Sequence, residues 1–402
     1  MLQTTSLNLE LIFWILLLIV FYTYVGYALL LAVLLFLKKI VSPEKVRMSS
    51  DRLDLPRVCL FVTAYNEAAY VDEKVKNMLA QNYPANHIQY LWITDGSDDG
   101  TPEKLSRYAQ MEVHHLPERN GKIHAMNRGM KYVKAPVVIF SDSNTILCPE
   151  AVQVIVNTFA DPKVGCIAGE KRIVNKQSDD AAGSGENLYW KFESWVKRMD
   201  SDLNSAVGAV GELFAIRTAL FEEVENDTIL DDFIISLRIA QKGYRIAYTP
   251  NAYAIETASV NVIEELKRKV RIAAGGLQTV VRLKELLNPF RYGWLSMQYI
   301  SHKVLRWTIA PLALFSLFFV NFLLLLKDWD MGVPVFYSAF FYLQVFMYLL
   351  ALIGWVLERR KIRFKLLFVP FYFTAINYAS LLGWVRFLKG KQSVLWEKSK
   401  RA

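Results

Sequence analysis

Charged residues and cysteines are scarce in this chain of 402 residues. Asp, Glu, Lys and Arg together make up 21% of the residues, whereas hydrophobic residues make up 53%. This composition excludes a disordered or collagen-like protein, and it indicates that apolar segments accompany an ordinary folded domain. The cysteines, Cys59, Cys148 and Cys166, are odd in number and lack the spacing of metal ligands. We therefore expect neither a disulfide framework nor a zinc site, which fits a domain that works in the cytosol.

Two common nucleotide-binding motifs are also missing. The sequence has no Gly-x-x-x-x-Gly-Lys-[Ser/Thr] loop, and no Gly-x-Gly-x-x-Gly follows the first predicted strand, which argues against a nucleoside triphosphatase or a dinucleotide-dependent oxidoreductase. The predicted folded domain also carries no surplus of basic residues. The stretches 358–365 and 386–402 carry +4 and +5, account for the whole net charge of +9, and adjoin apolar segments. We therefore expect no nucleic-acid partner.

Four long uncharged runs are present. They cover residues 11–37, 308–326, 331–357 and 366–385. A helix needs about 20 apolar residues to cross a bilayer, so each run predicts a membrane-spanning helix rather than a buried core helix. The first run lacks the basic start and the cleavage site of a signal peptide, which predicts a retained membrane anchor over 1–40. The other three predict a C-terminal transmembrane domain over 308–388.

Basic residues beside the first run predict how the chain is oriented. Lys and Arg are absent from the first ten residues, whereas four of them follow the run between positions 38 and 47. We therefore expect an integral protein of the inner, or cytoplasmic, membrane with its large middle region in the cytosol. The same rule places the basic loop 358–365 inside, but it conflicts with the basic tail 389–402. Either the fourth run is a re-entrant or interfacial helix, or the tail is an exception to the rule.

The stretch 286–307, directly before the second run, mixes aromatic with basic residues. It contains Phe290, Trp294, Lys303 and Arg306, and its uncharged core is too short to cross a bilayer. This pattern predicts an amphipathic helix that lies in the membrane interface. A helix on the surface of the soluble domain is the alternative.

The middle region, residues 41–285, alternates strand and helix signals. Apolar runs at 58–63, 90–94, 111–116 and 136–141 predict strands, and polar turns and helical stretches separate them. Such alternation is typical of a mostly parallel sheet with helices on its faces. The predicted fold class is therefore α/β, with a Rossmann-like, mostly parallel sheet and additional transmembrane helices. Ligands of such sheets bind beyond the carboxyl ends of the strands.

Polar side chains gather at three of these predicted strand ends. Residues 65–67 follow the first strand, Asp95 follows the second, and Asp142 and Asn144 follow the fourth. A turn explains each cluster alone, because Asp, Asn and Gly favour turns. Together, and with Lys122 nearby, they predict one crevice that holds a phosphorylated ligand with a divalent cation.

A second polar group follows in the later part of the middle region. Asp231 and Asp232 lie near the start of a predicted helix, where negative charge is favoured, so helix capping explains either residue. An aspartate at the edge of a nucleotide site is also able to act as a general base. The basic run 267–271 leaves a similar choice, since it is either a solvated face or a source of positive charge beside a diphosphate.

These motifs, in this order and flanked by these apolar runs, resemble a membrane-embedded family-2 glycosyltransferase. The resemblance extends from Val-Thr-Ala-Tyr-Asn-Glu at 62–67 to the C-terminal runs, and it is strongest to bacterial exopolysaccharide, poly-N-acetylglucosamine, cellulose and hyaluronan synthases. It implies a GT-A fold for the cytosolic domain, a nucleotide-sugar donor, expected to be a UDP-sugar, and Mg²⁺ or Mn²⁺ as the metal. The residues that match the family's donor-binding positions are Thr63, Tyr65, Glu67, Asp95, Lys122 and Asp142.

The resemblance also implies roles for the residues that carry the chemistry. Asp142 and Asn144 occupy the place of the metal-binding Asp-x-Asp, and Asp232 occupies the place of the catalytic base. Arg268 and Arg271 lie where the family has Gln-x-x-Arg-Trp. The implied reaction is a single displacement in which the base takes a proton from an acceptor hydroxyl and the anomeric centre is inverted.

Three departures from the family pattern bear on the function. Asn144 replaces an aspartate, Arg268 replaces the glutamine, and Ile272 replaces the tryptophan that supports the acceptor in processive relatives. The main hypothesis is an inverting transferase that extends a membrane-associated glycan in extracellular or envelope polysaccharide synthesis. The alternatives are transfer of a single sugar to a lipid-linked acceptor and a catalytically silent nucleotide-binding subunit. Expected partners are the bilayer, the nucleotide-sugar and a lipid-linked or growing glycan, with partner subunits or a homo-oligomer as further options.

Overall fold

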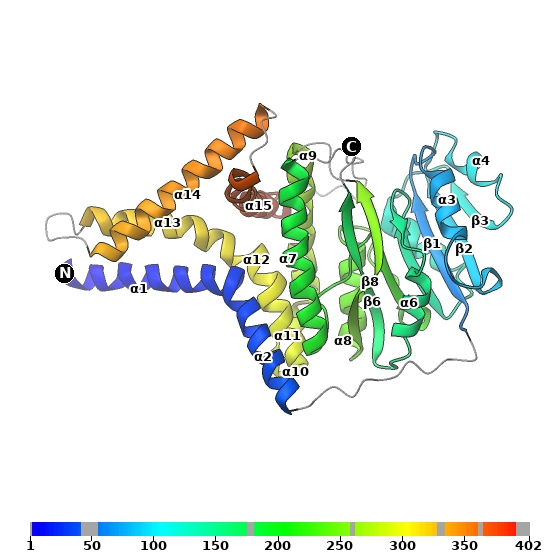
Figure 1. The fold of residues 1–402 in the computed structure, drawn as a ribbon, viewed down its shortest axis with the longest axis horizontal. Coiled ribbons are helices and arrows are strands. Elements are labelled where there is room, and N and C mark those ends of the chain that lie inside the picture. The colour runs from blue at the N-terminus through cyan, green and yellow to red at the C-terminus, as the bar shows by residue number, and fades with distance from the viewer. Residues whose placement is uncertain are drawn as a thin grey trace.

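A computed structural model describes residues 2–41, 55–174, 181–257, 262–327, 334–360 and 365–390 of the chain. Figure 1 shows an α/β part, which holds the strands, and a helical part in which α1 (Leu2–Phe21), α13 (Ile309–Lys327) and α14 (Val335–Arg359) project away from it. Parts of the basic loop 358–365 and of the tail 389–402 lie outside the described residues, so their predicted sides of the membrane stay predictions.

One eight-stranded sheet forms the centre of the α/β part. Its strand order is β3-β2-β1-β4-β7-β6-β8-β5. The bounds are β1 Val58–Ala64, β2 Ile88–Asp95, β3 Met111–Leu116, β4 Val137–Asp142, β5 Ile146–Leu147, β6 Val164–Val174, β7 Leu213–Arg217 and β8 Arg245–Thr257. The first four strands match the four apolar runs of the sequence to within two residues at either end.

The sheet is mostly parallel, as predicted. β1 pairs in parallel with β2 and β4, β2 with β3, and β6 with β8. β7 is antiparallel to both of its neighbours, and the short β5 is antiparallel to β8. The register sets Thr63 beside Asp142 and Ala64 beside Thr94. The carboxyl ends of β1, β2 and β4 therefore meet at one edge, where the predicted polar loops leave the sheet.

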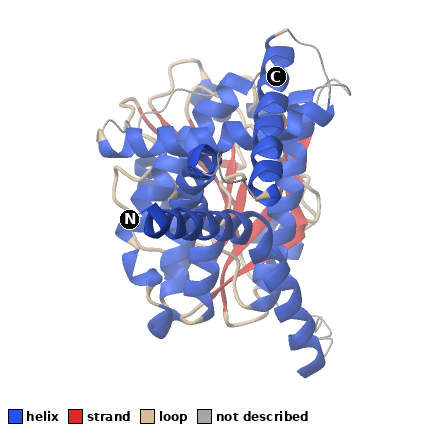
Figure 2. Ribbon diagram, turned by 90° about the vertical axis from the view of Figure 1, so that its left-hand side faces the viewer, coloured by secondary structure: helices blue, strands red, loops and turns tan. Residues whose placement is uncertain are grey.

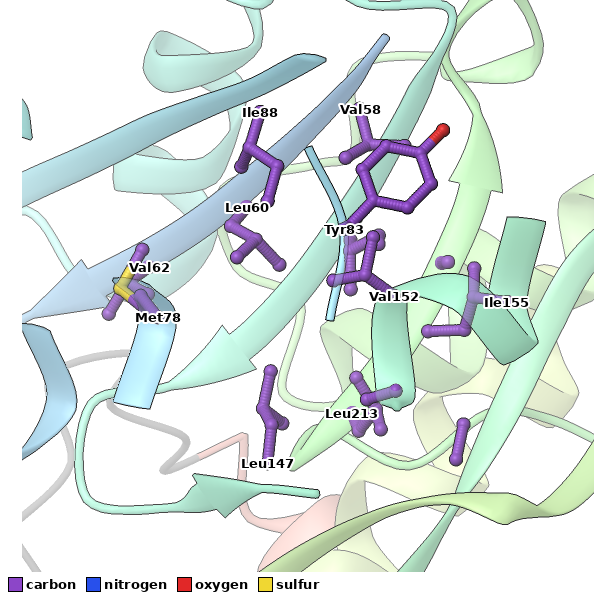
Figure 3. Packing of buried hydrophobic residues seen from close by; sticks show 14 of the residues in the cluster. Val58, Leu60, Val62, Met78, Tyr83, Ile88, Leu147, Val152, Ile155 and Leu213 are labelled. Carbon is purple, nitrogen blue, oxygen red and sulfur yellow. The ribbon is translucent and has the colours of Figure 1, made fainter. Parts of the chain in front are cut away.

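Each face of the sheet is covered by helices. The even-numbered residues of β1 pack against α3 (Val71–Leu79) and α6 (Ala151–Thr158), and Figure 3 shows this core. Cys59 and Phe61 of β1 pack on the opposite face, together with α5 (Lys122–Met130) and α8 (Asp231–Gln241). Because both faces of the central strands are buried, their sequences are continuous apolar runs.

Two helix pairs connect the α/β part to the membrane part: α2 (Tyr27–Val41) with α7 (Ala181–Leu203), and α9 (Val262–Arg282) with α15 (Lys365–Leu388). Tyr27 and Leu31 of α2 share a buried cluster with α7. α9 lies against α15 so closely that a Cβ on Gly383 would come within 2.6 Å of the Cβ of Ala273. These contacts hold the helical part at a defined position on the α/β part.

Four helices of the described part are long and apolar enough to cross a membrane. They are the N-terminal helix Asn8–Val41, then Ile309–Lys327, Val335–Arg359 and Leu367–Leu388. Each of them covers most of one predicted uncharged run. Large apolar side chains point outward along them; Leu18, Phe319 and Tyr342, for example, are between 64% and 70% exposed. Such surfaces require apolar surroundings, so the chain is a membrane protein.

The first membrane helix changes direction at a π-helical turn, η1 (Tyr22–Gly26), which joins α1 to α2. In Figure 1, α1 runs with the projecting helices and α2 turns toward the α/β part, and Figure 2 shows the projecting helices in front of the sheet. The Tyr22 and Ser301 hydroxyls share a hydrogen bond of 2.7 Å, and Tyr24 donates one to the Asn377 side chain. A π turn is a recognised cause of helix bending, and these bonds fix the bend.

The stretch 286–307 differs from the predicted single helix. It consists of short pieces: η4 (Lys284–Leu287), α10 (Pro289–Tyr292), α11 (Trp294–Tyr299), the π-helical η5 (Ile300–Val304) and α12 (Leu305–Trp307). Gly293, with a φ of 52°, interrupts it. Gln298 and His302 are fully buried and hydrogen-bond Asp200 of α7. These polar contacts explain why part of the stretch packs against protein; its position in the membrane interface stays a prediction.

Candidate active site

Asp95, at the carboxyl end of β2, anchors the loop that leads into α5. Its Oδ2 accepts hydrogen bonds from the backbone N–H groups of Asn120 (2.9 Å) and Gly121 (2.6 Å). Its Oδ1 is buried and has no hydrogen-bond partner among the described residues. Gly96 has a φ of 70°, and a Cβ there would lie 2.5 Å from the Cβ of Arg119, so only glycine fits this close approach. The tight turns leave one oxygen of Asp95 available to a ligand.

The loop after β1 is joined to the loop after β2. Asn66 adopts a left-handed conformation with a φ of 54°, and its N–H donates to the Ser97 hydroxyl. The Glu67 N–H donates to the Thr101 hydroxyl at 2.9 Å. The Tyr65 ring lies under the guanidinium group of Arg119, 3.8 Å from the ring centroid. The predicted donor-binding residues of β1 and β2 are therefore on one connected surface.

Lys122 brings together carboxylates from two distant parts of the chain. Its ammonium group lies 2.9 Å from Oδ1 of Asp142, at the end of β4, and 3.3 Å from Oδ2 of Asp231, at the start of α8. Burial alone would lower the pKa of Lys122, but the charges of Asp142 and Asp231 outweigh it and raise the pKa well above the ordinary value. Lys122 is therefore a permanent positive charge at the carboxyl edge of the sheet.

Asp232, the predicted base, lies beside this cluster. Its Oδ1 accepts a hydrogen bond from the Phe233 N–H at 2.8 Å. Burial, followed by the negative charge of Asp231, raises the pKa of Asp232 to about 7, although Lys122 acts in the opposite direction. Leu230 occupies the N-cap position of α8, so neither aspartate is the N-cap residue of this helix, and both lie in its first turn. A carboxylate with a pKa near 7 is well suited to accept and release a proton.

The two arginines predicted on α9 differ in their surroundings. Arg268 forms two hydrogen bonds with Glu265, of 2.8 and 2.9 Å, so its charge is largely matched inside its own helix. Arg271 lies on the cavity wall, and burial, followed by the nearby charge of Arg268, lowers its pKa to about 10. Both side chains line the cavity, but Glu265 balances the charge of Arg268, so we expect a ligand to meet the charge of Arg271 first.

One cavity of about 500 Å³ connects these groups with the membrane helices. At one end its walls include Lys122, Asp142, Asp232 and Arg271. At the other end they include Tyr24 of η1 and side chains of α15, among them Val369, Phe373 and Asn377. Thr63, Tyr65, Glu67, Asp95 and Asn144 lie outside its walls. The structure therefore brings the predicted chemical residues into one cavity and leaves the nucleoside-binding candidates on the neighbouring surface.

A divalent cation fits the donor chemistry of the β4–β5 loop. Asp142 offers a carboxylate and Asn144 an amide oxygen, which are the hard ligands that Mg²⁺ and Mn²⁺ prefer. The described residues contain no group of three or more His, Cys, Asp or Glu side chains placed to hold a metal. Two protein ligands suffice for a metal whose other ligands are phosphate oxygens and water. The residues present therefore fit a metal that binds together with a diphosphate.

Lys74 is a candidate residue that the sequence analysis misses. It lies on α3, is 1% exposed, and donates hydrogen bonds to Ser141 Oγ (2.6 Å) and to the Thr145 carbonyl (2.7 Å). Burial lowers its pKa to about 7, against the opposing charge of Asp142. From its position on α3, Lys74 thus fixes the two residues, Ser141 and Thr145, that flank Asp142 and Asn144 in this loop. The sequence offers no clear signal for it, because a lysine in an amphipathic helix normally indicates a solvated face.

Comparison with protein families gives one clear match over the α/β part. The model of the family described as "Glycosyltransferase like family 2" matches residues 56–275. The matched region contains all eight strands and every predicted site residue.

Curated relatives share this region at moderate identity. A poly-beta-1,6-N-acetyl-D-glucosamine synthase of Staphylococcus aureus (strain COL) is 29% identical over 238 residues, which are 57% of this chain and 57% of the relative. An enzyme of the same name from Staphylococcus epidermidis is 25% identical over 256 residues, 61% of each chain. The chain therefore spans less than two thirds of the length of the curated relatives it matches.

One solved structure resembles nearly the whole chain. It is the mannosyltransferase PcManGT from Pyrobaculum calidifontis in complex with GDP-Man and Mn²⁺, with a TM-score of 0.73 and 21% sequence identity. The similarity covers 95% of this chain and 99% of that one. The predicted α/β class with a GT-A-like fold is confirmed, and the shared fold includes helices beyond the sheet.

Proposed function

Because this chain belongs to glycosyltransferase family 2, we propose that it transfers a sugar from a nucleotide-sugar to an acceptor held at the membrane. One observation carries the proposal: a single cavity joins Asp232, Lys122 and Arg271 to a wall formed by the membrane helix α15. A donor bound at the sheet edge and an acceptor that arrives from the membrane would meet at Asp232. The α/β part is proposed to face the cytosol, because basic residues follow the first membrane helix.

The donor is proposed to be a UDP-sugar bound across the ends of β1, β2 and β4. A buried carboxylate oxygen without a partner is costly, and an N–H group of a nucleobase would satisfy Oδ1 of Asp95. Thr63, Tyr65 and Glu67 are proposed to complete the nucleoside site. The curated relatives are named for poly-N-acetylglucosamine synthesis, which makes a donor of N-acetylglucosamine the first candidate. The structural neighbour holds GDP-Man, so guanosine donors belong in the test.

The chain's own residues are proposed to perform an inverting single displacement. Asp232 takes the proton from an acceptor hydroxyl while that oxygen attacks the anomeric carbon from the side opposite the diphosphate. The bond from this carbon to the diphosphate breaks, and its electron pair leaves with the nucleotide. Lys122 and Arg271 stabilise the departing charge, with Arg268 as a further positive charge behind them. A divalent metal held by Asp142 and Asn144 would supply Lewis-acid stabilisation of the same diphosphate.

Two outcomes are compatible with this chemistry. Extension of a glycan in extracellular or envelope polysaccharide synthesis follows from the names of the curated relatives. Transfer of a single sugar is favoured by Ile272, which lines the cavity where processive relatives are expected to have tryptophan. A catalytically silent subunit is disfavoured, because Asp142, Asp232 and Lys122 converge on one cavity.

The test is turnover by the purified chain in lipid nanodiscs. A panel of UDP- and GDP-sugars is presented with Mg²⁺ or Mn²⁺, and nucleotide release is followed together with the mass of the product. Release from one donor, with a product longer by one or more sugars, supports the proposal and identifies the donor. Failure of every donor to turn over, while a nucleotide still binds, would contradict it.

A further inference from the structure

Membrane segments provide an apolar part of the cavity wall. Val369, Phe373 and Ile376 of α15 line it, and Tyr24 of η1 closes the same side. Tyr24 is held there by its hydrogen bond to Asn377, one turn further along α15. A polar glycan would leave these hydrocarbon side chains facing hydroxyl groups. A hydrocarbon chain would match them, at the depth where the membrane helices meet the α/β part.

Positive charge is gathered beside this wall. Lys303 and Arg306 line the cavity and form ion pairs with the single carboxylate Glu193, Arg306 at 3.1 Å. Lys197 lines the same cavity and is 5% exposed. Burial lowers the pKa of Lys303 to about 8; Glu193 opposes this effect, whereas Lys197 and Arg306 add to it. Lys303 and Arg306 therefore share the carboxylate of Glu193, and Lys197, whose charge also acts on Glu170, adds a third cation to this part of the wall. The wall carries more positive charge here than Glu193 alone balances, which favours an anion.

Arg306 retains hydrogen-bonding capacity inside the protein. Its Nε is buried and donates no hydrogen bond to any described residue. The next residue, Trp307, is fixed on three sides, since its ring packs against Phe233 at 5.2 Å, a Cβ on Gly276 would lie 2.4 Å from the ring, and its carbonyl accepts from Trp384. The backbone beside Arg306 is therefore rigid, and the unused N–H has a defined position. A phosphate group accepts such N–H donors strongly.

We propose that the acceptor is a lipid with a phosphate in its headgroup, bound with its hydrocarbon chain against α15 and η1 and its phosphate at Lys303 and Arg306. The inference rests on the proposed transferase function and names its acceptor class. A hydroxyl of the same headgroup reaches Asp232, which takes its proton. The hydroxyl oxygen forms the new bond to the anomeric carbon, and the donor diphosphate leaves with the electron pair of the broken bond. The lipid phosphate stays intact and serves only as an anchor.

Binding of a polyprenyl phosphate to the full chain in detergent tests this proposal. Its affinity is compared with that of the matching polyprenol, which lacks the phosphate, and with that of inorganic phosphate, which lacks the chain. We expect the polyprenyl phosphate to bind at least about tenfold more tightly than the polyprenol or inorganic phosphate, because it combines a charge-assisted hydrogen bond with burial of the apolar chain. Equal affinity of the alcohol would overturn the phosphate assignment, and equal affinity of inorganic phosphate would overturn the lipid assignment.

Two variants separate anion binding from a structural role of the ion pair. Arg306→Gln is expected to weaken binding of the polyprenyl phosphate about tenfold, whereas Glu193→Gln breaks the same ion pair but keeps the cations, and is expected to preserve or tighten binding. Equal losses in both variants would show that the pair acts only in packing. The comparison on the wild-type chain needs no variant, so it decides the question if Arg306→Gln fails to fold.

Measurements on the donor keep this inference separate from the proposed function. Nucleotide binding and sugar transfer are followed in the same preparation, with soluble sugars offered as acceptors. Transfer to a soluble sugar without any binding of the polyprenyl phosphate would retain the transferase function and reject the lipid acceptor. Binding of the polyprenyl phosphate without turnover of any donor would leave the binding site standing and reject the transferase function on which its role as acceptor depends.

Discussion

The ammonium group of Lys122 donates a hydrogen bond of 2.9 Å to Oδ1 of Asp142. Lys122 is the first residue of α5, and Asp142 is the last residue of β4. The bond therefore joins a helix N-terminus, which Asp95 fixes from β2, to the strand end proposed to hold the metal. A diphosphate placed at this junction would meet one fixed positive charge from the protein and one from the metal.

Replacement of Lys122 by methionine is expected to lower the rate of sugar transfer about 10²–10³-fold, because a preorganised charge at the leaving group is lost. Steady-state kinetics with the identified donor provide the measurement. Lys131→Met, at the other end of α5, is the matched control, since the Lys131 side chain is 70% exposed and should leave the rate unchanged. Equal rates for the wild type and Lys122→Met would remove Lys122 from the leaving-group site.

The rate of transfer should depend on pH through Asp232. The base must be ionised to accept a proton, and burial together with Asp231 raises its pKa to about 7. We therefore expect kcat/KM to fall about tenfold per pH unit below that value and to level off above it. The protonated form is favoured by folding, so this group's contribution to stability is lost as the pH rises through about 7. An inflection near the ordinary value of 3.8 would contradict the assigned environment.

Replacement of Gly211 by alanine is expected to leave the fold intact but to lower the rate of sugar transfer. A Cβ there would lie 3.5 Å from Nζ of Lys122 and 3.6 Å from Oδ2 of Asp232, which are ordinary contact distances. The methyl group would nevertheless occupy the space in front of both groups, so we expect about a 10²-fold loss of rate, as small misplacements of substrate often cause. Thermal unfolding in detergent should stay close to that of the wild type. Gly26→Ala, where the nearest atoms are also 3.5 Å away, is the control for thermal unfolding alone, because Gly26 belongs to η1, which borders the proposed acceptor site.

Lys74→Met should weaken the loop that carries the proposed metal ligands. The variant leaves the Ser141 hydroxyl and the Thr145 carbonyl without their buried donor, at a cost of about 1–3 kcal/mol in the free energy of unfolding. We also expect weaker binding of Mn²⁺ in the presence of nucleotide, measured by titration calorimetry. Lys76→Met, on the exposed side of the same helix, is the control. Unchanged stability and metal affinity in Lys74→Met would show that the loop keeps its conformation without Lys74.

Much of the fold could be predicted because both faces of the central strands are buried. Their sequences are continuous apolar runs, so β1 to β4 follow from local pattern, and their mostly parallel pairing follows from the alternation of strands and helices. Their order in the sheet does not follow from either. The break at Gly293 and the π turn η1 could not be predicted in this way. They depend on tertiary contacts such as the hydrogen bond between Tyr22 and Ser301, which are 279 positions apart in the chain.

The candidate site shows the same division between local and distant information. Asp95 and Asp142 follow strands, so their convergence at one edge could be predicted from topology alone. The pairing of Lys122 with Asp231 could not, because it depends on how α8 packs beside α5. The apolar end of the cavity depends on α15, whose contact with α9 is set by the small residues Gly383 and Ala273. Close helix packing of this kind leaves no distinct pattern in a single sequence.

The most direct test of the proposed function is sugar transfer by Asp232→Asn. The change keeps the size of the side chain but removes the base, so we expect the rate to fall about 10²–10⁴-fold while the affinity for nucleotide stays the same. Asp227→Asn is the control, because the Asp227 side chain is 66% exposed and lies outside the cavity walls. A rate in Asp232→Asn within about twofold of the wild type, with the donor and acceptor identified, would show that another group takes the proton and that the assigned base is wrong.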